Sequence, residues 1–378
     1  MRIFIKSVAF WLVSFLLFSI LSLNVGAEGE NIGSISARSA CLIEAESGRV
    51  LYSKNADKRL PMASTTKIMT AIVAIESGIA LNSVVKIPKS AVGIEGSSMY
   101  LYEGEELTFE ALIYGLLLSS ANDASVAIAI TVAGSVERFV EMMNKKAQEL
   151  SLTNTFFTNP HGLYHKEHYT TANELAILMA YCIKNPIFLT ISGCREKTVA
   201  MNEDSARVLV NHNRLLRTYS GVIAGKTGFT KMSGRCLVTS AERDGLRLIA
   251  VTLNAPNDWQ DHTNLYDFGF SNYQRIFFDE FSITIPVVSG TTDQLVLKAK
   301  GTSLFLPRDY QEVTTEIQAP SFVFGGVKMG EQIGKIVYKS GNKVVAVVPL
   351  IASENVNVKK YKFNLFEWLI DLIKGFLK

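Results

Sequence analysis

The chain has 378 residues, of which 48% are hydrophobic and 19% are charged. This composition is typical of a folded protein with a large buried core, enough for one large domain and a smaller one, and it argues against long disordered segments. The formal net charge is only +3, which argues against a nucleic-acid-binding protein, because such proteins normally carry a clustered basic surplus.

Residues 1–27 have the pattern of a secretory signal peptide. A short basic stretch from Met1 to Lys6 precedes an apolar run from Val8 to Leu23, and Val25-Gly26-Ala27 provides small residues at the usual cleavage spacing. We therefore expect cleavage after Ala27 and export of the protein. An uncleaved anchor is the alternative, because the apolar run approaches the length that spans a bilayer.

Residues 28–280 predict a mixed α/β domain. Two strands, Ala37 to Glu44 and Arg49 to Ser53, precede a series of helical runs, and two further strands follow them. The helical runs are Thr65 to Ile75, Phe109 to Leu118 with Thr108 as its N-cap, Asp123 to Ala133 and Ser135 to Leu150, and the later strands are Gly234 to Ala241 and Leu246 to Leu253. Strands on both sides of the helices indicate a sheet built from both ends of the domain and packed against a helical cluster.

Residues 281–357 predict a separate β-rich domain. Its short apolar strands are broken by Ser289-Gly290, Gly325-Gly326 and Ser340-Gly341-Asn342. No cluster of candidate catalytic residues falls in this segment.

Residues 359–378 have the pattern of an amphipathic helix that lies in a membrane interface. At about 100° per residue, the polar residues fall in one narrow sector and apolar residues fill the rest. The polar residues are Asn364, Glu367, Asp371, Lys374 and Lys378. Because charge interrupts the apolar run, the segment is poorly suited to spanning a bilayer, and we expect attachment to the outer face of the cytoplasmic membrane. Docking on the protein itself or in an oligomer contact is the alternative.

Three short patterns carry candidate chemistry, and each alone is common by chance: Ser64-Thr65-Thr66-Lys67, Ser120-Ala121-Asn122 and Lys226-Thr227-Gly228. If Ser64 opens a helix, Lys67 returns to the same face one turn later, where its amine can take the proton of the serine hydroxyl. That role requires burial and a nearby positive charge, such as Lys226, to lower the pKa of Lys67. The helix start also directs the Ser64 backbone N–H toward a developing oxyanion.

The other two patterns fit the handling of a peptide substrate. Ser120 can relay a proton to a leaving amine, and Asn122 can hydrogen-bond the substrate backbone. Lys226 and Thr227 suit recognition of a substrate carboxylate, and Gly228 permits a close approach to the backbone.

In this order, the three patterns resemble those of penicillin-binding proteins and serine β-lactamases. Four segments are more narrowly similar to the low-molecular-mass D-alanyl-D-alanine carboxypeptidases: Pro61 to Lys67, Asn159 to Leu163, Gly225 to Gly228 and Asn254 to Trp259. The resemblance covers roughly residues 35–280. It implies a β-lactamase-like α/β domain, with an antiparallel sheet and a helical cluster, followed by a small all-β domain and a C-terminal amphipathic helix.

The resemblance implies an enzyme that removes the terminal D-alanine from peptidoglycan stem pentapeptides. Ser64 would attack the peptide carbonyl with Lys67 as base, Ser120 and Lys226 would guide a proton to the departing D-alanine, and water would hydrolyse the acyl-enzyme. β-Lactam antibiotics would acylate Ser64. Neither a metal nor an organic cofactor is implied.

The resemblance also implies substrate contacts. The backbone N–H groups of Ser64 and Phe229 would form the oxyanion hole, and Thr227 would hold the terminal carboxylate. No arginine is assigned to that carboxylate, because Asn254 to His262 contains none, unlike the matching stretch of some relatives.

Three alternatives remain beside this interpretation. A class A β-lactamase normally has a Glu-x-x-x-Asn arrangement between the second and third patterns, but Glu174 here is followed by Leu175 to Leu178 with no asparagine in place. A transpeptidase or endopeptidase of the same superfamily is harder to exclude, because the choice between water and an amine as the acceptor depends on the shape of the cleft. A catalytically silent penicillin-binding or wall-scaffolding protein would show degenerate patterns, and all three are intact.

Several other residues have plainer interpretations. The five histidines are scattered, so we expect turn and capping roles rather than a catalytic triad or a metal site. Asp123 is expected to cap the helix that follows it, and Asn159 to Leu163 is expected to be a structural loop near the site. The four cysteines match neither a disulfide framework nor a zinc pattern and are expected to be free.

Overall fold

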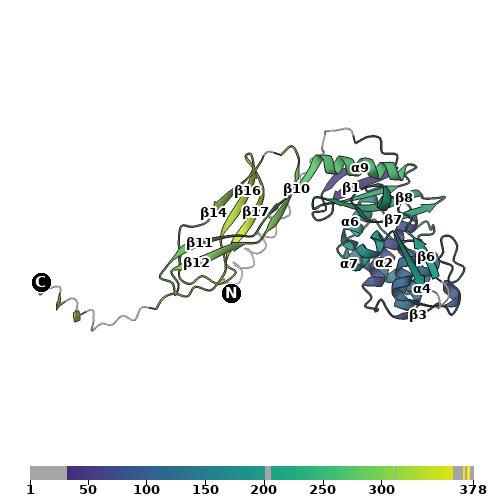
Figure 1. Ribbon diagram of the computed structural model, residues 1–378, viewed down its shortest axis with the longest axis horizontal. Coiled ribbons are helices and arrows are strands. Elements are labelled where there is room, and N and C mark those ends of the chain that lie inside the picture. The colour runs from purple at the N-terminus through teal and green to yellow at the C-terminus, as the bar shows by residue number, and fades with distance from the viewer. Residues whose placement is uncertain (1–31, 201–205, 311, 361–368, 371–372, 375–378) are drawn as a thin grey trace, which may run out of the picture.

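The structure is a computed structural model that describes residues 32–200, 206–310, 312–360, 369–370 and 373–374. The predicted signal peptide lies outside these residues, as does most of the predicted C-terminal helix. The described residues form two domains in an elongated molecule, an α/β domain and a smaller all-β domain (Figure 1).

A five-stranded antiparallel sheet, in the order β2-β1-β9-β8-β7, forms the centre of the first domain. The first two strands come from the start of the domain and the other three from its end, so the prediction of a sheet built from both ends is confirmed. The strands are β1 (Ser39–Glu44), β2 (Val50–Lys54), β7 (Val222–Thr230), β8 (Gly234–Arg243) and β9 (Leu246–Leu253).

Helices cover both faces of this sheet. On one face, α9 (Asp258–Asn272) packs its Leu265 and Tyr266 into a core with Leu42 and Leu248. A larger helical cluster covers the other face, and every residue of its central helix α2 up to Ala74 is buried. The helical elements of that cluster are η1 (Ala63–Thr66), α2 (Lys67–Ile75), η2 (Lys89–Ala91), α3 (Phe109–Leu117), α4 (Asn122–Ala133), α5 (Val136–Glu149), α6 (Ala172–Cys182) and α7 (Pro186–Gly193). A short helix, α8 (Leu215–Thr218), packs against β7.

Local signals explain where these helices begin. The Thr108 side chain accepts a hydrogen bond from Ala111 N at 3.2 Å, which confirms it as the N-cap of α3. Thr171 caps α6 in the same way through Glu174 N at 3.1 Å. All four cysteines are free, as expected. Within the described residues, no single helix is long and apolar enough to cross a membrane, and α6 and α7 meet the criterion only as a pair bent by 110°.

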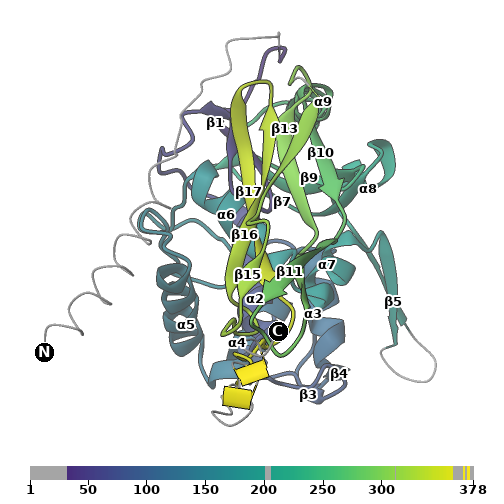
Figure 2. The same cartoon turned by 90° about the vertical axis from the view of Figure 1, so that its left-hand side faces the viewer.

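Two small hairpins complete the first domain. The strands β3 (Val84–Lys86) and β4 (Glu106–Thr108) pair with each other, as do β5 (Glu196–Ala200) and β6 (Ala206–Val210). The second hairpin projects from the body of the domain (Figure 2).

The all-β domain contains a six-stranded sheet, in the order β14-β16-β17-β12-β11-β15, and a two-stranded sheet, β10-β13. Its core includes the fully buried Leu295, Leu297 and Leu350. The strands are β10 (Tyr273–Phe278), β11 (Phe281–Val288), β12 (Gln294–Ala299), β13 (Thr302–Pro307), β14 (Val313–Gln318), β15 (Val323–Phe324), β16 (Gln332–Ser340) and β17 (Lys343–Ala352).

Where the domains meet, the guanidinium of Arg275 on β10 forms ion pairs with the buried Glu44 and with Glu46. The Tyr273 ring stacks on Phe305, with centroids 5.2 Å apart, and Arg49 lies over both rings. These contacts join the two-stranded β10–β13 sheet to the end of β1.

Candidate active site

The structure brings Ser64 and Lys67 together at the start of α2. Ser64 lies in the 3-10 turn η1, and Lys67 is the first residue of the α-helix that continues it. The Lys67 Nζ lies 2.9 Å from the Ser64 Oγ. The residue before the serine, Ala63, has a left-handed φ of 48°, a conformation that non-glycine residues keep only where surrounding contacts impose it.

Lys67 is fully buried, and its amine has two further oxygen neighbours. Nζ lies 2.6 Å from Asn122 Oδ1 and 2.7 Å from the backbone carbonyl oxygen of His161. Burial is the main cause that holds the Lys67 pKa well below its usual range, and the charge of Lys226 lowers it further, against an opposing effect of Asp123. An uncharged amine has two hydrogens and one lone pair. It can therefore donate to the two oxygens and accept the proton of the Ser64 hydroxyl.

Ser120 and Lys226 form a second hydrogen-bonded pair. Ser120 lies in the connection between α3 and α4 with a left-handed φ of 58°, and its Oγ lies 3.0 Å from the Nζ of Lys226 on β7. Lys226 also donates to the carbonyl oxygen of Thr227 at 2.9 Å. Burial lowers the pKa of Lys226 to about 7. Asn122, the last residue of the triplet that begins at Ser120, is the first residue of α4.

Two glycines lie against the Ser64 backbone. A Cβ at Gly162 would lie 2.0 Å from the Ala63 carbonyl oxygen and 2.9 Å from Ser64 N, and a Cβ at Gly228 would lie 3.0 Å from Ser64 N. The backbone of the 159–163 loop and that of β7 therefore approach the serine more closely than any side chain would allow. The Lys-Thr-Gly pattern lies within β7 itself.

The loop from Asn159 to Leu163 is fastened to itself and to α2. The Asn159 side chain accepts from Gly162 N at 2.7 Å and donates to the Leu163 carbonyl at 2.9 Å. Thr70 of α2 donates to the Pro160 carbonyl at 2.6 Å. The loop thus has the expected structural role, and it also supplies the His161 carbonyl beside Lys67, a backbone contact that residue types could not predict.

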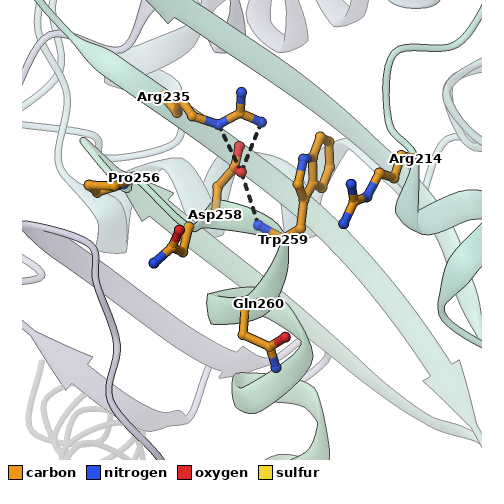
Figure 3. Close-up of a pocket in the computed structure, with 7 residues that line it drawn as sticks. Arg214, Arg235, Pro256, Asp258, Trp259 and Gln260 are labelled. Atoms are coloured by element: carbon orange, nitrogen blue, oxygen red, sulfur yellow. Dashed lines mark hydrogen bonds and ion pairs between the residues drawn. The ribbon is translucent and has the colours of Figure 1, made fainter.

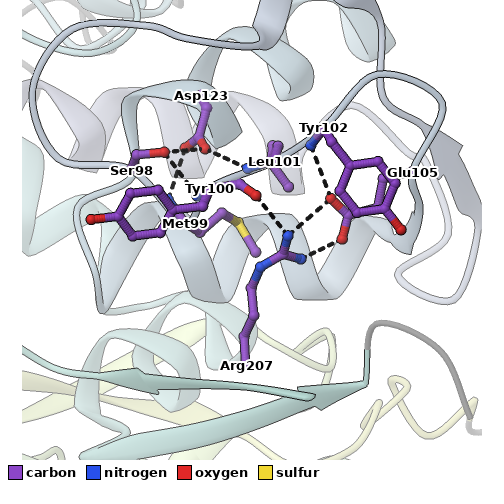
Figure 4. Close-up of polar contacts among 8 residues, drawn as sticks. All are labelled: Ser98, Met99, Tyr100, Leu101, Tyr102, Glu105, Asp123 and Arg207. Atoms are coloured by element: carbon purple, nitrogen blue, oxygen red, sulfur yellow. Dashed lines mark hydrogen bonds and ion pairs between the residues drawn. The ribbon is translucent and has the colours of Figure 1, made fainter. Parts of the chain in front are cut away.

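Asp123 does not have the expected capping role. Its carboxylate accepts one hydrogen bond from α4, from Ala124 N, but its other partners are Ser98 Oγ at 2.6 Å, Met99 N at 3.1 Å and Leu101 N at 3.0 Å (Figure 4). The prediction was wrong because Asp123 is the second residue of α4 and its side chain faces this neighbouring segment. Asp123 therefore fixes a loop beside the site.

The same loop is held from a second direction by the β5–β6 hairpin. Arg207 of β6 donates to the Glu105 carboxylate and, at 2.8 Å, to the Tyr100 carbonyl (Figure 4). Closer to the site, Asn122 N donates to the Ser97 carbonyl at 2.7 Å, and the Asn122 amide donates to the Glu95 carbonyl. The loop from Glu95 to Glu105 therefore sets the position of the Asn122 side chain that contacts Lys67.

An arginine that the sequence did not assign lies beside the Lys-Thr-Gly strand. Arg235 of β8 stands directly opposite Phe229 in the β7–β8 pairing, on the face that Thr227 shares. Its guanidinium pairs with Asp258 and lies 5.6 Å from the Trp259 ring centroid, with Arg214 on the other side of that ring (Figure 3). These residues line a cavity of about 340 Å³.

Three of the five histidines have rings that are neutral at pH 7. Burial lowers the pKa of His168 and of His262 to about 3 and that of His161 to about 4, so all three rings are neutral at pH 7. His168 Nδ1 accepts from Thr158 N at 3.0 Å, which leaves Nε2 as the donor to Thr66 Oγ1 at 2.7 Å. Within the described residues, no group of three or more histidine, cysteine or acidic side chains could hold a metal ion.

Glu174 is likewise structural. Its carboxylate accepts from Asn154 N at 2.8 Å and from the Thr155 hydroxyl. These bonds hold the turn before the 159–163 loop.

Family models, curated relatives and solved structures all match this chain to the same group of proteins. Residues 25–257 match the family model described as D-alanyl-D-alanine carboxypeptidase, and residues 278–358 match the C-terminal domain of penicillin-binding protein 5. The chain is 35% identical to the D-alanyl-D-alanine carboxypeptidase DacF of Bacillus subtilis, over 87% of this chain and 88% of that protein. It is 33% identical to DacC of Escherichia coli, over 85% of each. The crystal structure of penicillin-binding protein 5 from Haemophilus influenzae superposes with a TM-score of 0.72 at 30% identity, covering 87% of this chain and 100% of that one.

Proposed function

The chain belongs to the D-alanyl-D-alanine carboxypeptidase family, and on this premise we propose that Ser64 is its catalytic nucleophile and Lys67 the base that activates it. The protein is a penicillin-binding serine peptidase of cell-wall metabolism. The assignment rests on the buried Lys67 amine, whose Nζ lies 2.9 Å from Ser64 Oγ. The amine also has the Asn122 Oδ1 and the His161 carbonyl oxygen as acceptors, and its pKa is lowered.

The first half of the cycle forms the acyl-enzyme. Ser64 Oγ attacks the carbonyl between the last two D-alanines of a stem pentapeptide, and its proton passes to the Lys67 amine. The backbone N–H groups of Ser64 and Phe229 hydrogen-bond the oxyanion, and Gly228 lets β7 approach closely enough for this. The C–N bond then breaks, and the proton that Lys67 took passes to the departing D-alanine through Ser120, which is hydrogen-bonded to Lys226. Lys67 is thereby uncharged again before water enters.

The second half restores the enzyme. Water attacks the ester carbonyl, loses a proton to Lys67 and releases the shortened peptide, with Ser64 Oγ recovering its proton. Asn122 hydrogen-bonds the substrate backbone while it orients Lys67. Thr227 and Lys226 bind the terminal carboxylate of the substrate.

The cellular location of the protein is argued from residues 1–27 and residues 359–378. We propose that residues 1–27 direct export, that the catalytic domain spans 28–280 and the β-rich domain 281–357, and that residues 359–378 attach the protein to the outer face of the cytoplasmic membrane. In this last segment the described residues Leu369, Ile370 and Ile373 are helical and exposed, as an interfacial helix requires.

The test locates the covalent adduct. Residues 28–378 treated with penicillin and then digested should give one modified peptide, with the penicilloyl group on Ser64, and the untreated protein should release one D-alanine from a pentapeptide ending in D-Ala-D-Ala. An adduct on Ser120 would overturn the assignment. Transfer to an added amine in place of hydrolysis would show a transpeptidase, and cleavage of a cross-linked dimer alone would show an endopeptidase.

The pH dependence of acylation tests the role assigned to the Lys226 charge. Because that charge lowers the Lys67 pKa, Lys226→Met should raise it and move the rising limb of the acylation rate to higher pH. His161 is neutral at pH above about 4 and so does not produce this limb. The measurement is the second-order rate of penicillin acylation against pH. Lys226→Arg carries a positive charge at every accessible pH and should not move the limb to higher pH, and an equal upward shift in both variants would contradict the role.

A further inference from the structure

The end of the β-rich domain that lies far from the active site is formed by three chain segments. Strands β11 and β15 pair there in parallel, with Val288 opposite Phe324. Gly326 N donates to the Val356 carbonyl at 2.6 Å, and Lys359 N donates to the Ser289 carbonyl at 2.8 Å. Residues 287–290, 322–330 and 355–360, which we call the distal end, therefore form one surface, and the chain leaves the domain from it (Figure 1).

The distal end carries large apolar side chains on its outside. Phe324 is 63% exposed, Met329 68% and Val358 57%, and Phe322 is 45% exposed. The rings of Phe322 and Phe324 are 5.5 Å apart, and a Cβ at Gly326 would lie 3.7 Å from Val358 Cγ2, so Val358 lies beside the segment that carries the two rings. Single exposed apolar residues are ordinary, but a group of this kind marks a surface that binds something.

The position of the C-terminal segment indicates what covers this surface. Val358 is separated from Phe363, the first apolar residue of the amphipathic segment, by only four residues. At about 3.5 Å per residue, the two are no more than about 18 Å apart. A segment that lies in the membrane interface therefore holds the distal end at the bilayer surface.

The charges on and around the distal end leave only a small basic surplus, so we expect apolar insertion to make the main contribution to binding. The distal end carries three exposed lysines, Lys328, Lys359 and Lys360, and the exposed Glu331 and Glu354 flank it, so the five residues together have a net charge of only +1. Burial of phenylalanine, methionine and valine side chains at the boundary of headgroups and acyl chains needs no anionic lipid.

We propose that the distal end of the β-rich domain is itself a membrane-contacting surface, with Phe322, Phe324, Met329 and Val358 buried in the lipid interface. This inference rests on the proposed attachment through residues 359–378 and adds a second, rigid contact to it. With two contacts the domain stands on the membrane by its distal end, and the active-site domain lies at its opposite end, toward the wall (Figure 1).

The experiment measures binding of residues 28–378 to phosphatidylcholine vesicles by co-sedimentation. Removing one half-exposed valine or phenylalanine from the interface should weaken binding about fivefold for Val358→Ser and about tenfold for Phe324→Ser. The matched control is Val344→Ser. Val344 is 51% exposed but lies at the other end of the domain, next to Lys343, whose Nζ donates to Tyr310 Oη at 2.8 Å. Its binding should equal that of the wild type.

The outcomes separate the two proposals. If the wild type binds vesicles and all three variants bind equally, the distal end does not contact lipid and only this inference fails. If the wild type does not bind, the proposed attachment fails as well. If Val358→Ser and Phe324→Ser instead dissociate a dimer in the absence of vesicles, a second copy covers the surface. D-Alanine release from soluble pentapeptide should be unchanged in all three variants.

Discussion

Replacing Lys67 by methionine should lower the rate at which penicillin acylates Ser64 by about a thousandfold, within the range that general-base catalysis contributes. Methionine matches the length and burial of the lysine stem but has no amine to take the serine proton. D-Alanine release should fall by at least as much, because the same amine also serves deacylation. The measurements are intact-protein mass spectrometry of the penicilloyl adduct over time and the release of D-alanine.

A second variant distinguishes loss of the base from loss of a positive charge. Arginine remains protonated at all accessible pH values, so Lys67→Arg should be as slow as Lys67→Met even where its side chain fits. Lys54→Met is the control, because Lys54 also donates to a backbone carbonyl, that of Ile35, but lies on β2 away from Ser64. Acylation by Lys67→Met at more than a tenth of the wild-type rate, in protein with a normal unfolding transition, would exclude Lys67 as the base.

The sequence predicted the chemistry of this site better than its geometry. Ser64, Lys67, Ser120, Asn122 and Lys226 could be selected because an activated serine needs a base, and a lysine base needs burial and a neighbouring charge. Their order along the chain supplied the resemblance to a family. The structure brings these five side chains into two hydrogen-bonded groups, around Lys67 and around Ser120.

The fold was predicted where periodicity is strong and missed where glycines interrupt it. The apolar runs of β8 and β9 and the amphipathic face of α5 were identified within a few residues of their observed bounds. Strand β7 was not, because Gly225 and Gly228 lower its apparent strand propensity. Those glycines are present because neighbouring groups come within about 3 Å of where their Cβ atoms would lie, and that is a long-range requirement.

Contacts between distant segments were beyond sequence reasoning. Nothing in the residue types around Asp123 indicated that its carboxylate would hold Met99 and Leu101 rather than cap a helix. The ion pair of Arg207 with Glu105 joins residues 102 positions apart. Both contacts position the loop that fixes Asn122. The reacting residues could therefore be recognised from the sequence, but the contacts that hold them in place could not.

The second large effect is expected from a residue that has no side chain. Gly162 has a φ of 92°, and a Cβ there would lie 2.0 Å from the Ala63 carbonyl oxygen and 2.4 Å from its carbonyl carbon. Both atoms belong to the backbone of the turn that carries Ser64, and they cannot move away as a flexible side chain could. Gly162→Ala should therefore displace either η1 or the 159–163 loop, and with them the His161 carbonyl that contacts Lys67.

A displacement of about 1 Å at a catalytic group can cost about a hundredfold in rate, so Gly162→Ala should lower penicillin acylation by that factor or more. Gly78→Ala is the matched control, because Gly78 has a φ of 82° with nothing within 4 Å of its Cβ position. It carries the same backbone strain, about 1 kcal/mol, without the collision. The loss of thermal stability of both variants reports the backbone strain, and the loss of acylation rate in Gly162→Ala reports the displacement that the collision causes. If Gly162→Ala and Gly78→Ala lose stability equally and both acylate at the wild-type rate, the close approach of the 159–163 loop does not position Ser64.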